Sequence, residues 1–200
     1  MDFFEKVRGF LLDPSKAFDA AKGEKLEEAI KYYAIIAAVY SALLAVLLTF
    51  IGTMLGSLMG GPIGGLIGAG AGAGGGIIFF ILFMIFAIIG AFIGGAILHI
   101  FVYLVGGRKG LEQTIKAVMY GSTPGLLLGW IPIIGFIAGI WSLVLEILGI
   151  RQLHELTTGK AVLAVLIPII IAVVLAVIIA ALFIASFRSG IVPYRGYRGY

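Results

Sequence analysis

Long apolar runs separated by short polar segments set the pattern of this 200-residue chain. Residues 32–107 contain no Asp, Glu, Lys or Arg, and residues 161–187 contain none either. Residues 117–150 contain Glu146 alone. A bilayer core about 30 Å thick is crossed by about 20 apolar residues of helix. The pattern therefore predicts an all-α integral membrane protein, a bundle of five transmembrane helices at about 31–52, 77–105, 115–130, 135–150 and 161–186.

Polar segments flank this transmembrane domain, which we assign to residues 31–186. The N-terminal segment, 1–30, begins MDFFEKVRGFLL, in which apolar residues recur at helical spacing with basic residues among them. That pattern favours an amphipathic helix, either lying in the membrane interface or packed as a short helix on the bundle, and both alternatives stay open. Asp13 and Pro14 suit the cap and first position of a second helix. We expect the tail, 187–200, to be disordered.

A glycine-rich insert, GTMLGSLMGGPIGGLIGAGAGAGGG at 52–76, lies between the first two predicted spans. Seven of its glycines recur at every fourth residue, which in a helix leaves a groove where another backbone can approach closely. Each step of four turns about 400°, so the groove winds, and Pro62 is expected to start a separate short helix. Its packing residues are Gly64, Gly68 and Gly72; the alternative is an irregular apolar loop. A formal GxGxxG match lacks the strand and acidic residue of a dinucleotide site.

Small residues also predict close helix contacts within the spans. The packing residues are Gly90 and Gly94 in the second span and Gly121 and Gly125 in the third. Pro124, in YGSTPG, is expected to kink the third span, and Pro132, in WIPIIGF, to turn the chain into the fourth.

Composition supports an integral membrane protein and argues against other classes. Hydrophobic residues make up 62% and charged residues 12% of the chain, against about 45–50% and about 25% in soluble domains, and the mean hydropathy is +1.17. The chain has no cysteine, so disulfides and thiol chemistry are excluded. The net charge of +4 does not indicate a nucleic-acid partner, because the basic residues sit beside spans, where they meet anionic lipid headgroups.

The distribution of lysine and arginine predicts the orientation of the chain. With five spans, eleven of these residues lie on the N-terminal side and three in the C-terminal tail. The N-terminus is therefore predicted to be cytoplasmic and the C-terminus outside. A sixth span through 53–76 would split the same residues nine to five, which disfavours it and makes the insert a re-entrant, interfacial or extramembrane element.

Ionisable residues at membrane depth are the candidate functional groups, because burying them there is costly. Glu146 and His99 lie near the cytoplasmic ends of their spans, at a depth where they can pair. His154 and Arg151 are within helical reach of Glu146. The group is either a cation or proton site or a structural ion pair. The spacings match no metal motif, and no nucleophile–base pair or cofactor motif is found, so neither an enzyme nor a cofactor is expected.

The order of these elements resembles the Yip1 domain family of five-span membrane proteins. The resemblance rests on FLLDPSKAF before the first span, VGGRKGLEQTIKAVMYGSTPGLL leading into the third, and WSLVLEILGIRQLHELTTGKA leaving the fourth. Within these stretches an Ala-Tyr-x-x-x-Pro-like element falls on Ala117 to Pro124. The loop pattern of the family falls on Gly149, Ile150, His154, Thr157, Lys160 and Ala161.

The resemblance implies a non-catalytic scaffold that organises membranes by helix packing and by binding partner membrane proteins or copies of itself. Eukaryotic members of the family also bind small GTPases and have longer N-terminal regions, whereas this chain resembles the small prokaryotic members. The residues alone leave an alternative, a small channel or transporter for ions or small solutes that uses Glu146, His99 and His154. A transporter requires a polar cavity reaching Glu146, whereas a scaffold requires Glu146 to be closed off and hydrogen-bonded.

Overall fold

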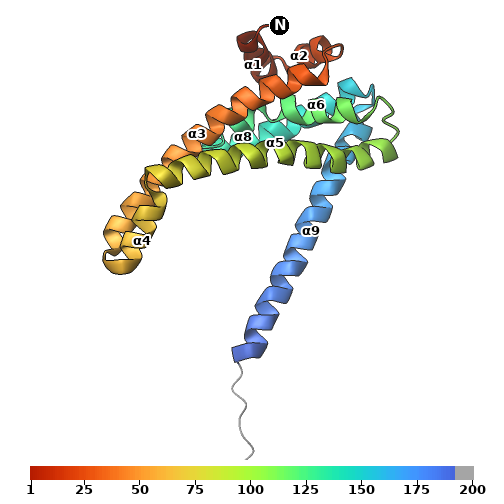
Figure 1. Cartoon of the computed structure of the whole chain (residues 1–200). Helices are drawn as coiled ribbons and strands as arrows, with labels where there is room; N and C mark the ends of the chain where they lie inside the picture. The colour runs from red at the N-terminus through yellow and green to blue at the C-terminus, as the bar shows by residue number, and fades with distance from the viewer. Residues whose placement is uncertain (192–200) are drawn as a thin grey trace, which may run out of the picture. The chain divides into compact units, whose positions relative to one another are not determined.

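The computed structural model describes residues 1–191, apart from the side chains of Ala73 and of residues 188–191, and every regular element in that part is a helix (Figure 1). The chain divides into two compact units, Met1–Val165 and Leu166–Tyr200. The second unit contains most of the last helix, α9 (Thr158–Ile191). That helix includes the first residues of the predicted tail, and the rest of the tail, 192–200, lies outside the described residues.

Several of the described helices are long and apolar enough to cross a membrane. The four candidate spans are α3 (Leu26–Met59), Gly74–Leu104 in α5 (Ala73–Leu104), α8 (Ile134–Leu153) and Thr158–Phe187 in α9. The prediction of an all-helical protein with several membrane spans is confirmed. The count of five spans is not, and it stays a prediction.

The predicted third span, 115–130, is not one helix. Pro124 has no amide hydrogen to donate to the carbonyl of Tyr120 one turn earlier, and the Thr123 hydroxyl donates to that carbonyl instead, at 2.6 Å. The helix is interrupted at Ser122 as a result, and neither part is long enough to cross a bilayer alone. The two parts are α6 (Leu111–Gly121) and α7 (Thr123–Leu128).

A tight turn connects α7 to α8 around Pro132. The amide of Ile134 donates to the carbonyl of Pro132 at 2.8 Å, and Ile133 between them has a φ of 70°. This left-handed conformation is uncommon for a β-branched residue. Ile133 is also 82% exposed, so its side chain adds no packing that would offset the strain.

The glycine-rich insert forms a close-packed helical hairpin between the end of α3 and α4 (Gly61–Ala71), beside each other in Figure 1. Gly60 and Gly61 turn the chain with φ values of 60° and 59°, a conformation that favours glycine. A Cβ built on Gly56 would lie 2.7 Å from both the Gly64 oxygen and the Gly68 nitrogen, which are backbone atoms of α4. The glycines therefore let the backbones of α3 and α4 touch. Their four-residue spacing forms this contact within the hairpin and does not form one flat helix face.

Two N-terminal helices pack on the bundle through buried aromatic rings. α1 (Phe3–Leu12) begins with a capping box between Asp2 and Glu5, and α2 (Pro14–Ala21) is capped by Asp13 as predicted. Phe10 and Phe18 are fully buried, and the Phe10 ring stacks on the Tyr120 ring with centroids 4.6 Å apart. One face of α1 thus packs on the bundle, as in one of the two alternatives predicted for the first helix.

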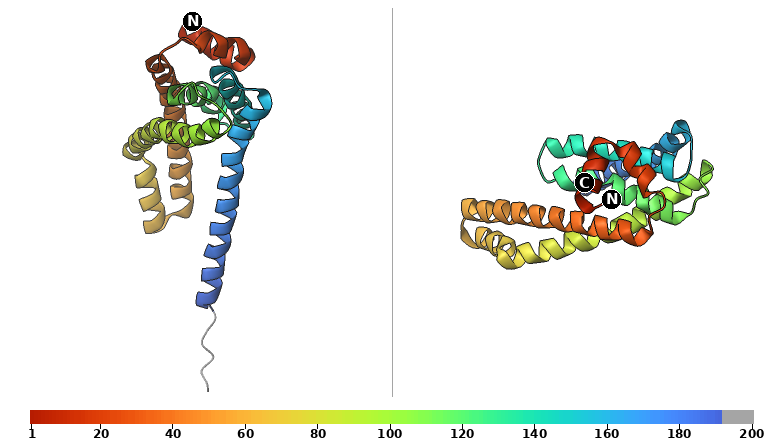
Figure 2. Two further views of the ribbon diagram at one scale, coloured as in Figure 1. Left: turned by 90° about the vertical axis from the view of Figure 1, so that its right-hand side faces the viewer. Right: turned by 90° about the horizontal axis from the view of Figure 1, so that it is seen from above.

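The long helices α3 and α5, which α4 connects, run side by side in Figure 1 and in the right-hand view of Figure 2. The Tyr33 hydroxyl of α3 donates to the Ala87 carbonyl of α5 at 3.0 Å. α6 packs on α3, α5 and α8, so its buried face lies at the centre of the first unit. That position allows side chains of α6 to reach three of the other helices.

Candidate functional site

A chain of two histidines and one threonine joins α5, α6 and the end of α8. His99 Nδ1 lies 2.7 Å from the Thr114 hydroxyl, which lies 2.9 Å from His154 Nε2. A hydroxyl carries one hydrogen, so Thr114 donates to one imidazole and accepts from the other. The two rings are therefore held in linked tautomers, with their centroids 5.9 Å apart.

His154 is buried in a setting that favours its neutral form. Its side chain is 3% exposed, and its Nδ1 atom has no hydrogen-bond partner among the described residues. A Cβ on Gly107 would come within 3.1 Å of that atom, so the loop backbone covers it closely. Burial, aided by the nearby His99 and Lys109, lowers the pKa of His154 to about 4. The ring is uncharged at neutral pH.

Glu146 lies apart from this histidine pair. It is half-buried on α8, where a Cβ on Gly121 would come within 2.8 Å of its Cγ. In the described part of the chain no hydrogen bond or ion pair joins Glu146 to His99, His154 or Arg151. Arg151 is exposed on the last turn of α8. Of the four predicted polar residues, the structure thus brings together only the two histidines.

A second polar cluster, centred on Glu24, fastens the N-terminal helices to α6. Lys6 of α1 pairs with the Glu24 carboxylate at 2.9 Å, and the Tyr120 hydroxyl donates to the same carboxylate. Burial acts to raise the pKa of Glu24, but the hydrogen bonds from Tyr120 and Lys6 outweigh it and lower the pKa. Fully buried Lys116 donates to the carbonyls of Lys22 at 3.2 Å and Glu24 at 2.6 Å.

Sequence reasoning missed both Thr114 and the Glu24 cluster. Neither set has a periodic spacing, because its members come from helices far apart in the chain and meet only through folding. One available signal was Lys116, which falls within the apolar pattern of the third predicted span. A lysine at such a position is expected to need partners.

The predicted packing glycines fall into two groups. Gly121 and Gly125 face α8, and the Gly125 amide donates to the Ser142 hydroxyl at 2.8 Å. Gly64 is buried against α3, whereas a Cβ on Gly68, Gly90 or Gly94 would meet no atom within 4 Å. Gly72 follows α4 and faces only the preceding turn. In α5 the glycine that faces α6 is Gly95, where a Cβ would lie 3.0 Å from the Ile115 side chain.

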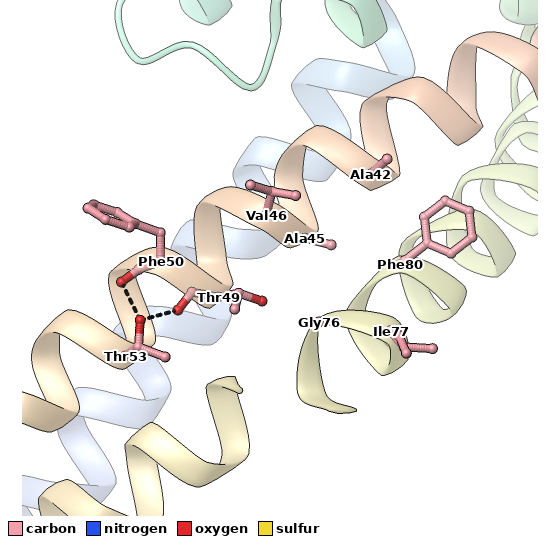
Figure 3. A pocket seen from close by; sticks show the side chains of 9 residues that line it. All are labelled: Ala42, Ala45, Val46, Thr49, Phe50, Thr53, Gly76, Ile77 and Phe80. Carbon is pink, nitrogen blue, oxygen red and sulfur yellow. Dashed lines mark hydrogen bonds between the residues drawn. The ribbon is translucent and has the colours of Figure 1, made fainter. Parts of the chain in front are cut away.

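Of two cavities in the first unit, neither is lined by Glu146, His99 or His154. The larger, about 580 Å³, lies between α3 and α5 and has mostly apolar walls (Figure 3). The smaller, about 150 Å³, lies beside Lys6, Lys31 and Tyr32. Among the described residues no group of three or more His, Asp or Glu is placed to hold a metal ion.

These features define a multi-pass helical membrane protein with a fastened N-terminal helix pair. The family model of the Yip1 domain matches residues 8–181, so the chain belongs to the Yip1 domain family. No curated protein and no solved structure gives a significant match.

Four of the six residues of the family-like loop pattern, Gly149, Ile150, His154 and Ala161, are buried in the packed part of the fold. A Cβ on Gly149 would lie 2.8 Å from the Phe18 ring and 3.0 Å from Ala117, so glycine lets α2 and α6 both approach α8. Ile150 and Ala161 are fully buried, and His154 belongs to the histidine pair. Thr157 and Lys160 are exposed.

Proposed function

We propose that the protein is a non-catalytic membrane scaffold, which organises its membrane through helix packing, partner binding and insertion of α1 into one leaflet. The N-terminus is cytoplasmic and the C-terminus outside in this proposal, as the basic residues suggest. Its partners are anionic lipids and membrane proteins, including other copies of the chain. Membership in the Yip1 domain family supports this assignment.

The observation that carries the proposal is the outward face of α1. Phe4, Arg8 and Leu12 recur at a spacing of four, so they share one face, and all three are exposed. Phe4 is 79% and Leu12 74% exposed. On a helix lying in the headgroup region, two such exposed apolar side chains can enter the acyl boundary while the longer arginine between them reaches lipid phosphate.

The inward face of α1 gives that helix a rigid base. Phe10 packs against Phe18, Tyr32 and Tyr120, with ring centroids 4.6–5.9 Å apart. The Lys6–Glu24 ion pair, with 8% and 19% of the two side chains exposed, adds a polar contact. A helix fastened in this way transmits its insertion into a leaflet to the spans, whereas a loosely tethered helix moves independently of them.

Sorting between vesicles of different curvature tests the proposal. The protein, labelled on a cysteine appended to its C-terminus, is reconstituted into liposomes of mixed diameter, and its surface density is measured vesicle by vesicle. We expect density to rise several-fold on the smallest vesicles, because inserted helices favour curved leaflets. The Phe4→Ser/Leu12→Ser double variant should lose that rise.

A matched control changes an equally exposed phenylalanine elsewhere. Phe136 of α8 is 74% exposed, close to the 79% of Phe4, so Phe136→Ser makes the same change as Phe4→Ser without touching α1. This variant should keep the dependence on curvature. Equal density of the wild type on large and small vesicles would overturn the proposal.

One observation favours a second candidate function, transport. Glu146 is a half-buried carboxyl group in a candidate span and has no bonding partner among the described residues. Such a group is a possible ion or proton site. Proton flux into liposomes loaded with a pH-sensitive dye tests this: transport requires flux above that of empty liposomes, abolished by Glu146→Gln. The scaffold proposal expects both forms to match empty liposomes.

A further inference from the structure

The larger cavity lies between two membrane spans and has an almost entirely apolar wall. Its volume of about 580 Å³ falls within the range of about 300–1,000 Å³ that is usual for small-molecule sites. Figure 3 shows that α3 supplies one wall and the start of α5 the other. The lining residues are Ala42, Ala45, Val46, Thr49, Phe50, Thr53, Gly76, Ile77 and Phe80.

The two threonines in the wall do not make it a polar site. Thr53 Oγ1 lies 2.9 Å from the Thr49 carbonyl and 3.0 Å from the Phe50 carbonyl, so its hydrogen is used within α3. The Thr49 hydroxyl oxygen is buried and has no hydrogen-bond partner among the described residues, and a Cβ on Gly76 would lie 2.7 Å from it. No charged side chain lines the cavity. A charged or strongly polar ligand would therefore lose its hydration and gain at most the single hydroxyl of Thr49 in return.

The cavity is continuous with the apolar surfaces that its two helices present to the bilayer. Val46, Phe50 and Ile77 belong to its lining and are 70%, 66% and 63% exposed. Both walls come from the stretch 32–107, which has no charged residue. Whatever enters from the side therefore comes from the hydrocarbon region of the membrane.

We propose that this cavity is a binding site for one acyl chain of a membrane lipid, which enters sideways between α3 and α5. Water is a poor occupant, because a bound water molecule needs two to four polar partners. An empty space of this size would leave its lining without dispersion contacts. A helix of a second copy is about 10–12 Å across with its side chains, so the cavity takes little more than one turn of it.

Small side chains keep the space open. Ala42 and Ala45 stand where larger residues of α3 would reach toward α5. Gly76 is needed at the floor, because any side chain there would meet the Thr49 hydroxyl. The site thus explains why the last glycine of the insert's four-residue register is placed opposite α3.

Photo-crosslinking from a lipid tail tests the site in the full-length protein. The chain is reconstituted with phosphatidylcholine that carries a diazirine on one acyl chain, illuminated, digested and mapped by mass spectrometry. We expect crosslinks at 42–53 and 76–80 to be several-fold denser than on 169–187 of α9, whose side chains are also exposed. Equal density on both regions would overturn the proposal.

A filling substitution and its matched control complete the test. Ala42→Phe adds a ring at an exposed position of the lining and should lower crosslinking at the site several-fold. Ala176→Phe makes the same change on exposed α9 and should leave it unchanged. Undiminished crosslinking in Ala42→Phe would contradict the proposal, and so would crosslinks from these residues to a second copy of the protein.

Discussion

The hairpin between α3 and α4 gives a sharp prediction, because one glycine in it has no room for a methyl group and another has ample room. In Gly56→Ala the new Cβ starts 2.7 Å from the Gly64 oxygen and the Gly68 nitrogen. Both are backbone atoms, so no side-chain rotation relieves the contact. The two helices must separate until these distances reach at least the 3.4 Å of ordinary van der Waals contact.

Forcing packed elements apart in this way costs about 1–3 kcal/mol. Replacing glycine by alanine inside a helix also stabilises it by about 0.5–1 kcal/mol. Gly68→Ala has this gain alone, because a Cβ there meets no atom within 4 Å. Both variants have this gain, so the difference between their free energies of unfolding measures the clash of the Gly56→Ala methyl group with α4. We expect Gly56→Ala to be about 1–3 kcal/mol less stable than Gly68→Ala.

The assay is unfolding in mixed micelles with a rising fraction of denaturing detergent, followed by circular dichroism. The free energies of unfolding of the wild type and the two variants are compared under the same conditions. Gly68→Ala should match or exceed the wild type, and Gly56→Ala should fall below it. Equal stability of the two variants would refute the account of the hairpin as a close backbone contact.

Three further predictions concern the polar clusters. Burial holds the pKa of His154 at about 4 in the folded protein, below its ordinary 6.5. On acidification the unfolded chain therefore binds a proton at this residue before the folded protein does, so the melting temperature should fall between pH 6.5 and 4. In His154→Gln this fall should be shallower. Thr114→Val removes the hydroxyl between His99 and His154 and should lower the free energy of unfolding in detergent by about 1–3 kcal/mol, whereas Thr157→Val at an exposed position should leave it unchanged. Tyr120→Phe removes a hydrogen bond to the Glu24 carboxylate, and a loss of about 1.5–3 kcal/mol in the same assay is expected; no loss in either buried variant would contradict the roles given to these hydroxyls.

The apolar pattern predicted the long helices because each span needs a run of side chains compatible with lipid. The spans predicted from this pattern overlap all four candidate spans of the structure, including α3, which begins at Leu26, and α8, which begins at Ile134. The same pattern joined residues 115–130 into one span, because hydropathy carries no information about hydrogen bonds. The Thr123 hydroxyl bonded to Tyr120 beside Pro124 marks the interruption in the structure.

The candidate site was predictable in its residue types but not in its partners. The sequence marks His99 and His154 as candidates because ionisable groups near apolar spans are costly to bury. Their bridge through Thr114 depends on how α6 packs between α5 and α8, which no local spacing reveals. The sequence places Glu146 at a depth where it can pair with His99, but no hydrogen bond or ion pair joins the two among the described residues, and a Cβ on Gly121 would come within 2.8 Å of the Glu146 Cγ.

The depth of α1 in the membrane tests the scaffold account most directly. The chain has no cysteine, so Leu12→Cys and Lys16→Cys each place one spin label, the first on the outward face of α1 and the second at an exposed position of α2. In liposomes the account predicts that the Leu12→Cys label is accessible to oxygen and shielded from a water-soluble nickel chelate, with the opposite result for Lys16→Cys. Equal access of the nickel chelate to both labels would contradict it.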